Sequence, residues 1–415
     1  MKFKCGYKLS IATAVVVLGI GIDTSLTAFG ATFYSVMDLG NLGNSYLTTV
    51  TDINNIGQVV GNSTVSAITP DQVVLRAFRT SPNSPINPAT DNLGTLGGFV
   101  SVAKGINDIG QVVGASLPDG IIYLEAFLTA PNSPINPTED RLRLGGLDSN
   151  AAAINNEGVV VATKSIKFVG TNSYRIPPNR PVDSLTDNIG SLSGNSHLPF
   201  PAIYTEATDI NDIGQIVGTS RLPNGETRAF RTAPNQAIVP ETDNLGTLGG
   251  SYSRATAINN LGQVVGFSLN ANGETHAFRT APNQPIVPST DDLGTLGGVS
   301  SRASDINNLG QVVGESLNAS GETRAFLYDN GLMFDLNNLI PISDFTLNYA
   351  SGINDKGQIV AGFSGDNNLN NRIFLLTPVD SSSIPEPTSI LGMLSVLGIF
   401  KAVNYHKFRR SSKTR

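Results

Sequence analysis

One short phrase in this 415-residue chain begins with the residue types of a calcium-binding loop. The stretch Asp305-x-Asn307-x-x-Gly310 begins like a D-x-[DN]-x-[DN]-G loop, whose side-chain oxygens ligate the ion. Its fifth position is Leu309, which offers no oxygen. The first position varies among equivalent stretches, which carry Asp52, Gly105, Ala153, Asp209, Ala257, Asp305 and Gly352. Asx turns and bulges explain this pattern better, and we expect no metal.

Histidine and cysteine are too scarce to support a zinc site or a histidine-based catalytic group. Between residues 31 and 380 the histidines are His197 and His276, there is no cysteine, and no HExxH spacing occurs. His276 stands where other repeats carry Arg or Glu, which is typical of a solvated strand residue. No G-x-S-x-G or phosphate-binding phrase precedes a helix. We therefore expect no cofactor and no catalytic residue.

Pairs of carboxylates could cleave glycosides if the fold brought them together, for example Glu206, Glu226 or Glu274. Glu226, Glu274 and Glu322 each follow a turn glycine at equivalent places. Such repetition indicates a structural or surface role, because an active site is normally asymmetric. We expect a protein that is not an enzyme; a secreted carbohydrate-active enzyme with a central pocket is the alternative.

The least regular region, 151–208, is the best candidate for ligand recognition. It holds Tyr174 and Arg175, followed by "GNSHLPFPAIYTE", which brings His197 and Tyr204 into one loop. Binding residues are often carried by loops, so these four are our candidate ligand-binding residues. Drift in a tolerant repeat is the alternative.

These residues belong to a repeat. Seven copies of a phrase typified by INNLGQVVG, which number the repeats units one to seven, begin at Ile53, Ile106, Ile154, Ile210, Ile258, Ile306 and Ile353. A second phrase, typified by DLGTLGG, also occurs seven times. A third, RAF or a variant, follows the first in every unit except the third, which offers "SYRIPPN". A period near 48 residues is typical of a propeller blade.

The phrases predict short strands and tight turns. "QVVGES" and "ETRAFL" are rich in residues that favour strands, and Asn followed by Gly between them favours hairpins. We expect an all-β, seven-bladed β-propeller of four-stranded blades. The N-terminal "FYSVMDLGNLG" would complete the sheet of 353–376 and close the ring. Proline-rich connectors such as 281–291 would be exposed loops. An open β-repeat solenoid and two packed sandwiches are the alternatives.

The two ends differ from the repeats. Residues 1–30 carry Lys2, Lys4 and Lys8, an apolar run over 11–22 and small residues before a cut at Ala31, which predicts a secretory signal peptide. We expect residues 31–380 to form the propeller. Removing both ends leaves a net charge of −13, which favours solubility and argues against nucleic acid as a partner.

Residues 381–415 resemble a PEP-CTERM sorting signal. They carry Pro385-Glu386-Pro387, a short apolar segment over 390–400 and a basic end that includes Arg409 and Arg410. The resemblance implies transient membrane association and cleavage by an exosortase-type protease in a Gram-negative or cyanobacterial envelope. A simple membrane anchor is the alternative, although eleven apolar residues fall short of the roughly 20 that span a bilayer.

From 38 to about 376, the phrases INNLGQVVG, GETHAFRT and DLGTLGG resemble the extracellular HAF-repeat family. The namesake triplet is intact at His276-Ala277-Phe278. The resemblance implies export and a role at the surface, with no defined activity to carry over. We expect an exported cell-surface or extracellular-matrix protein that acts as a binding or structural module, with exopolysaccharide or surface proteins as partners.

Overall fold

The computed structural model describes residues 32–43, 47–65, 74–166, 170–194, 203–341, 343–363 and 371–379. These residues form strands joined by turns, with the short helices α3 (Pro240–Asp243) and α4 (Pro288–Asp291) and the 3₁₀ helix η1 (Leu336–Asn338). The predicted all-β class is therefore confirmed. The predicted signal peptide and the sorting tail lie outside the described residues. Within these ranges, the helices are too short and too polar to cross a membrane.

The strands of each unit pair antiparallel, and the first of them ends at the INNLGQVVG phrase. Short parallel pairings also join units three, four and five at their edges. The strands are β2 (Thr48–Ile53), β3 (Val59–Val65) and β4 (Val74–Arg79) in unit one; β5 (Gly97–Ile106), β6 (Val112–Pro118) and β7 (Glu125–Leu128) in unit two; β8 (Ser149–Ile154), β9 (Val160–Ile166) and β10 (Gly170–Ile176) in unit three; and β11 (Ile203–Ile210), β12 (Ile216–Arg221) and β13 (Thr227–Arg231) in unit four. They continue with β14 (Gly249–Ile258), β15 (Val264–Asn270) and β16 (Thr275–Arg279) in unit five; β17 (Gly297–Ile306), β18 (Val312–Asn318), β19 (Thr323–Asp329) and β20 (Leu332–Asp335) in unit six; and β21 (Tyr349–Ile353), β22 (Ile359–Phe363) and β23 (Arg372–Pro378) in unit seven.

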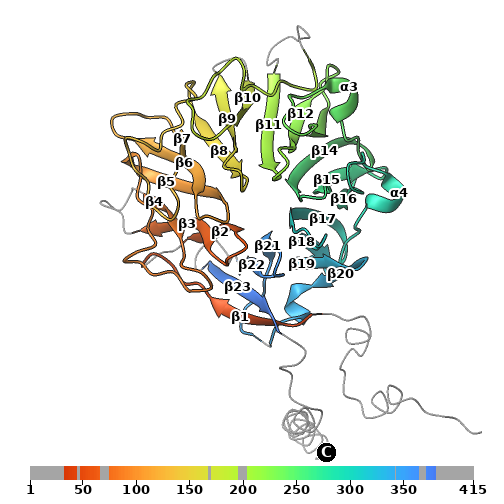
Figure 1. The fold of residues 1–415 in the computed structure, drawn as a ribbon. Helices are drawn as coiled ribbons and strands as arrows, with labels where there is room; N and C mark the ends of the chain where they lie inside the picture. Colours follow the sequence, from red (N-terminus) through yellow and green to blue (C-terminus); the bar gives the residue numbers. More distant parts are fainter. Residues whose placement is uncertain are drawn as a thin grey trace, which may run out of the picture. The chain divides into compact units, whose positions relative to one another are not determined.

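The sheets follow one another around a central axis, with the first strand of each unit innermost, as in a propeller (Figure 1). Neighbouring sheets bury their faces against each other. Val217 and Ala229 of unit four, for example, share a core with Ala255, Val264 and Phe278 of unit five. A single sheet could not bury both of its faces alone, so the units stabilise one another.

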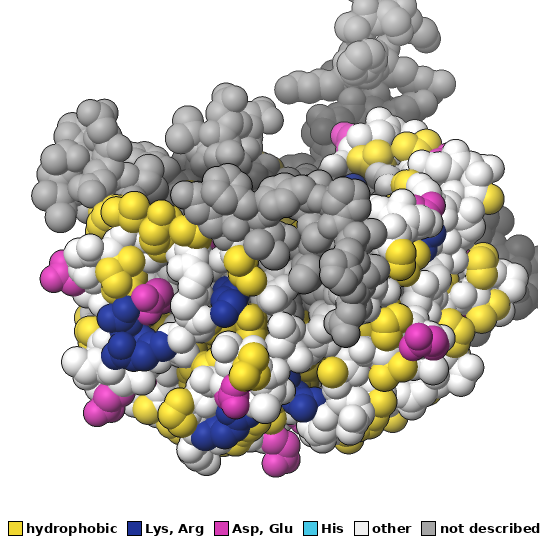
Figure 2. All heavy atoms as spheres, turned by 90° about the horizontal axis from the view of Figure 1, so that it is seen from above, with side chains coloured by type: hydrophobic (Ala, Val, Ile, Leu, Met, Phe, Trp, Pro, Cys, Tyr) yellow, Lys and Arg dark blue, Asp and Glu magenta, His cyan; other side chains and the backbone are white. Residues whose placement is uncertain are grey.

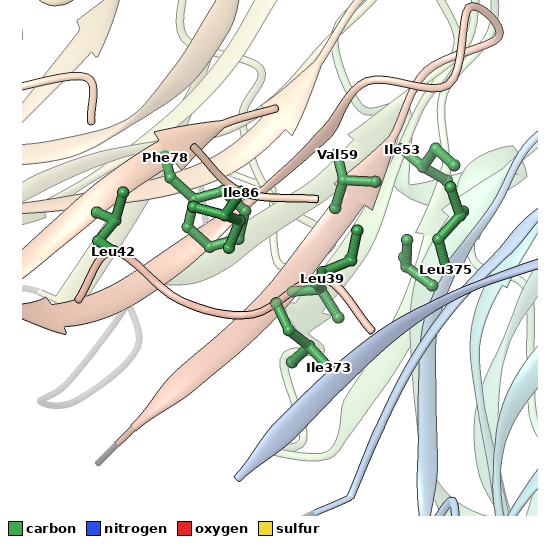
Figure 3. Packing of buried hydrophobic residues seen from close by; sticks show 10 residues of the cluster. Leu39, Leu42, Ile53, Val59, Phe78, Ile86, Ile373 and Leu375 are labelled. Atoms are coloured by element: carbon green, nitrogen blue, oxygen red, sulfur yellow. The ribbon is translucent and has the colours of Figure 1, made fainter. Parts of the chain in front are cut away.

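The N-terminal strand β1 (Tyr34–Asp38) lies beside β23 in the sheet of unit seven. The Leu39 amide donates to the carbonyl of Ile373 at 2.9 Å, and Arg372 contacts Asp38 at 2.8 Å. Leu39 also packs with Ile373 and with Phe78 of unit one in one buried cluster (Figure 3). The first and last parts of the described chain therefore share both a sheet and a core.

The first asparagine of the repeated phrase links each unit to the next. The Nδ2 atom of Asn54 donates to the carbonyl of Asn107 at 3.0 Å, and the same bond recurs from unit to unit until Asn354 donates to Asn54 at 3.0 Å. The donors, in order, are Asn54, Asn107, Asn155, Asn211, Asn259, Asn307 and Asn354. The repeated letters thus encode a turn and also a closed circle of buried hydrogen bonds.

The expectation of four strands in every unit is wrong for several units. Units one and two form three-stranded sheets, whereas unit six has four strands and unit seven gains its fourth from β1. In unit one the DLG-type phrase pairs at a single bridge, between Phe78 and Asn92. Gly94 then adopts a φ of 77° and its amide bonds the Oδ1 atom of Asn92, so the chain turns away before a strand can form.

The proline-rich connectors are less exposed than expected. Most of their residues lie on the surface, but four of the five connectors carry one buried isoleucine, and the connector of unit three carries the half-buried Val182 instead. Ile286 is 7% exposed, and its amide donates to the carbonyl of Leu245 at 2.8 Å. Ile86, Ile135 and Ile238 make the equivalent bond. The connectors therefore act as a second link between neighbouring units.

Candidate functional site

The third unit carries smaller side chains than unit five at two equivalent, paired positions of its sheet. In its sheet Asn150 pairs with Thr163; the matching pair in unit five is Arg254 with Phe267. Phe267 fills the space between units five and six, since Arg302 lies over its ring at 5.0 Å. Thr163 is too small to do so.

A cavity of about 370 Å³ occupies this position between units three and four. Its volume is at the lower end of the range of about 300–1,000 Å³ that is usual for small-molecule sites. Its walls combine polar side chains of the third unit with side chains of units two and four, among them Lys104, Asn150, Thr163, Ser165, Thr171 and Glu206. Asp148 adds a second carboxylate.

Glu206 is held in place by two neighbours. Both guanidinium nitrogens of Arg254 donate to its carboxylate at 3.0 Å, and the hydroxyl of Tyr204 donates at 2.7 Å. Burial favours the neutral acid, but the bonds from Arg254 and Tyr204 outweigh burial and lower the pKa of Glu206. Burial and the adjacent carboxylate raise the pKa of Tyr204 to about 12. Glu206 is therefore a fixed anion at neutral pH.

Three other polar groups of the cavity could also contact a ligand. The Oδ1 atom of Asn150 is buried and has no hydrogen-bond partner among the described residues. A buried acceptor without a donor costs free energy, so this atom favours a bound water or a ligand hydroxyl. Lys104 is exposed and supplies a positive charge. Asp148 accepts a bond from the amide of Leu124 at 2.9 Å.

Of the four predicted binding residues, Tyr204 lies nearest to the cavity, through its bond to Glu206. Tyr174 does not line the cavity. It is 2% exposed and takes the core position that a buried phenylalanine fills in other units. Arg175, which follows it, is also absent from the cavity wall, and burial lowers the pKa of its guanidinium. His197 lies outside the described residues.

The sequence reasoning selected the correct region for this cavity but missed Asn150, Thr163 and Ser165. A comparison of equivalent positions in the repeated units would have identified them. At the position of Ser165, units two, five and six carry Leu117, Leu269 and Leu317. A small polar residue in place of this leucine marks space that units two, five and six fill.

His276 is not the solvated strand residue that we expected. Its Nδ1 atom lies 2.9 Å from a carboxylate oxygen of Asp292, and its side chain is 16% exposed. In unit two the acidic residue takes the first of these two positions and a basic residue takes the second, with Glu125 accepting from Arg141 at 2.7 Å. The side chain at the histidine position of the HAF triplet therefore contacts the segment that follows the outer strand.

The remaining carboxylates that the sequence raised belong to turns. Glu226 bonds Arg228 at 2.7 Å, and Glu274 bonds Asn270 at 3.1 Å. Neither lines the cavity. In the described ranges, no group of three or more His, Cys, Asp or Glu side chains could hold a metal ion. The calcium-like phrase instead forms a turn, in which the amide of Gly310 donates to the carbonyl of Asn307 at 3.0 Å.

Solved structures share the fold of this chain at low sequence identity. An acylaminoacyl peptidase from Pyrococcus horikoshii matches with 7% identity and a TM-score of 0.50, over 82% of this chain and 54% of that chain. A chain from a study of two prolyl endopeptidases matches with 12% identity and a TM-score of 0.49, over 88% and 52%. This chain thus spans about half the length of these two chains.

A lectin from Aleuria aurantia, in complex with Fucα1-6GlcNAc, matches with 11% identity and a TM-score of 0.36, over 69% of this chain and 94% of that chain. No family model matches the chain, and no curated protein matches its sequence. At these identities the likeness to solved structures concerns the fold alone.

Proposed function

We propose that this chain is a non-enzymatic binding module built on a closed, seven-bladed β-propeller. Closure is supported by the pairing of β1 with β23 and by the seven asparagine bonds that return to Asn54. A closed ring protects the edges of its sheets, which suits a protein exported without disulfides. The open solenoid would require units one and seven to lie apart.

The cavity between units three and four is the observation that carries the binding function. It is lined by hydroxyls, an amide, a cation and carboxylates, and Asn150 presents a buried oxygen that needs a donor. These groups suit a hydroxyl-rich ligand such as one or two sugar units of an exopolysaccharide. A polar group of a surface protein is the other partner that we consider.

The proposal also includes export of the chain and its temporary anchoring at the membrane. Residues 1–30 would direct secretion, and residues 381–415 would hold the chain at the membrane until an exosortase-type protease cuts near Pro385-Glu386-Pro387. The basic Arg409 and Arg410 would remain with the removed tail. The product would reside at the cell surface or in the extracellular matrix of a Gram-negative or cyanobacterial cell. Its negative charge disfavours nucleic acid.

The side of the described body seen in Figure 2 is consistent with this partner choice. Lys and Arg side chains there lie close to Asp and Glu side chains, and hydrophobic side chains are scattered among polar ones (Figure 2). No extended basic surface is visible among the described residues on this side. Phosphate backbones need such a surface for tight binding.

The alternative is a carbohydrate-active enzyme that uses Glu206 and Asp148, which line the same cavity. A glycosidase needs one carboxylic acid with a raised pKa to protonate the leaving group. The pKa of Glu206 is lowered by Arg254 and Tyr204, which suits an anion that binds and does not suit an acid that donates.

A binding array of oligosaccharides, run beside a hydrolysis screen, tests the proposal. We expect retention without turnover, and loss of retention in Thr163→Phe and Ser165→Leu, which fill the cavity with the residues that unit five carries there. Glu206→Gln should weaken retention, whereas Glu226→Gln, a turn carboxylate outside the cavity, should not. Turnover that Glu206→Gln abolishes would establish the enzyme instead.

A further inference from the structure

The turn after each inner strand presents one side chain to solvent near the axis. In five units it is a branched aliphatic residue, and the exposed fractions are 40% for Ile56, 52% for Ile109, 46% for Ile213, 52% for Leu261 and 70% for Leu309. Units three and seven carry exposed Glu157 and Lys356 instead. The fold thus accepts a charge at this position, so folding does not require the five apolar side chains. Clustered exposed apolar groups usually mark an interaction surface.

Hydrogen bonds fix the order of these residues around the axis. The residue before each of them bonds the next unit: the amide of Asn55 donates to Asp108 at 2.8 Å, and the series closes when the amide of Asp355 donates to Asn55 at 2.9 Å. The members of this outer circle are Asn55, Asp108, Asn156, Asp212, Asn260, Asn308 and Asp355. Glu157 and Lys356 therefore stand on nearly opposite sides.

We propose that this face binds the same face of a second copy of the chain. In a face-to-face dimer the two-fold axis lies between the two copies and parallel to the plane of the circle, and the order of units in one copy runs opposite to that in the other. An axis that passes through Leu261 places Glu157 against Lys356 of the second copy, and Lys356 against its Glu157. The opposite signs of these two residues favour this one orientation.

With the same axis, each of the other turn residues also faces a residue of compatible chemistry in the second copy. Leu261 meets its own copy, Ile213 meets Leu309, and Ile56 meets Ile109, so each apolar side chain contacts an apolar side chain. Within the outer circle each carboxylate meets an asparagine; the pairs are Asp108 with Asn55, Asp212 with Asn308, and Asp355 with Asn156. Five of the six other axes bring two carboxylates face to face. The face is self-complementary in charge and in apolarity.

Sedimentation velocity over a concentration series tests the dimer. We expect a reversible monomer–dimer equilibrium, which Glu157→Lys weakens at least tenfold because two like-charge contacts replace two attractive ones. Lys356→Glu should weaken it equally. The double variant exchanges the two charges and should restore the dissociation constant to within about threefold of the original.

An apolar variant and a matched control complete the experiment. Leu309→Lys, which copies the residue of unit seven, should weaken the dimer, whereas Val299→Glu, at the other end of β17 and 61% exposed, should leave it unchanged. A chain that stays monomeric throughout the series would overturn the proposal and leave the face to another partner. A dimer that Leu309→Lys or Glu157→Lys does not weaken, or that the double variant does not restore, would also overturn it.

Discussion

At the scale of single residues, the buried asparagine circle carries much of the stability that links the units. Asn307 is 3% exposed; its Nδ2 atom donates to the carbonyl of Asn354 at 3.0 Å and to Gln311 at 2.8 Å, and its Oδ1 atom accepts from the amide of Gln311 at 3.0 Å. Removing this side chain leaves several buried polar groups without partners. Each such group costs about 1–3 kcal/mol.

Asn307→Ala should therefore lower the free energy of unfolding by about 3 kcal/mol, measured by denaturant titration. Asn308→Ala is the matched control, because Asn308 is half-buried and water can replace its bonds to Asp355. We expect a loss of about 1 kcal/mol or less for the control. Equal losses in the two variants would contradict the role given to the inner circle.

Three enclosed aspartates, Asp52, Asp209 and Asp305, should make stability depend on pH, because burial raises the pKa of each carboxyl group. Burial raises the pKa of Asp209 to about 7 and that of Asp305 to about 6, although each carboxylate accepts two backbone amides, for example from Ile210 and Ile258 at Asp209. Because these pKa values exceed the ordinary value of 3.8, their contribution is fully present below pH 3.8 and is lost as pH rises through 6 to 7.

We expect Asp209 and Asp305 together to lower the free energy of unfolding by roughly 4 kcal/mol between pH 5 and pH 8. Replacing Asp209 and Asp305 by alanine, which units three and five carry as Ala153 and Ala257, should make this profile shallower, and Asp52 should retain the remaining slope. Denaturant titration at each pH measures both proteins. A double variant with the same slope as the original chain would show that the pH dependence arises elsewhere.

At the scale of elements, four of the five connectors hold neighbouring units together through one buried side chain each. Ile286→Ala should lower the free energy of unfolding by about 2–4 kcal/mol, because it leaves a cavity beside the core of unit five. Val287→Ala, at the next residue, removes a side chain that is 42% exposed and should cost less than about 1 kcal/mol. Thermal unfolding compares the two, and a reversed order would contradict the anchoring role.

Strands and turns could be predicted from the sequence where residues close together in the chain determine them. The hairpin of β18 and β19 follows from two valine- and phenylalanine-rich stretches, and Gly321 adopts a φ of 78° in the turn expected between them. The fourth strand could not be predicted reliably. Its formation depends on whether the chain continues after the bridge at Asn92 or bends at Gly94.

The sequence predicted the region of the chain that carries the cavity, but it did not predict most of the residues that line it. Its walls come from three units, so no local pattern identifies Lys104, Asn150 and Glu206 together. Tyr174 was chosen because the unit around it is irregular, yet its ring keeps the core position of a repeated phenylalanine. The irregular sequence therefore marked a unit whose packing has changed. The side chains that make the difference line the cavity toward unit four, and Tyr174 is not one of them.

At the scale of the whole molecule, the account depends on the ends of the described body meeting. The sequence indicated this meeting through a lone DLG phrase at the start and a missing strand at the end. Two contacts support this meeting. In unit seven β1 pairs with β23, and the side chain of Gln358 donates to that of Asn83, which follows unit one, at 2.9 Å. Each of the seven units would then have a neighbour on both faces of its sheet, and no unit would expose a bare sheet face.

Hydrogen–deuterium exchange of the intact chain tests closure most directly. We expect peptides that cover β1 and β23 to exchange as slowly as those of β18, and deletion of residues 34–43 to expose the amides of 372–376 and the inner face of unit one. The contrary result would be fast exchange of β1, at the rate of an unpaired segment, with no change in β23 after the deletion.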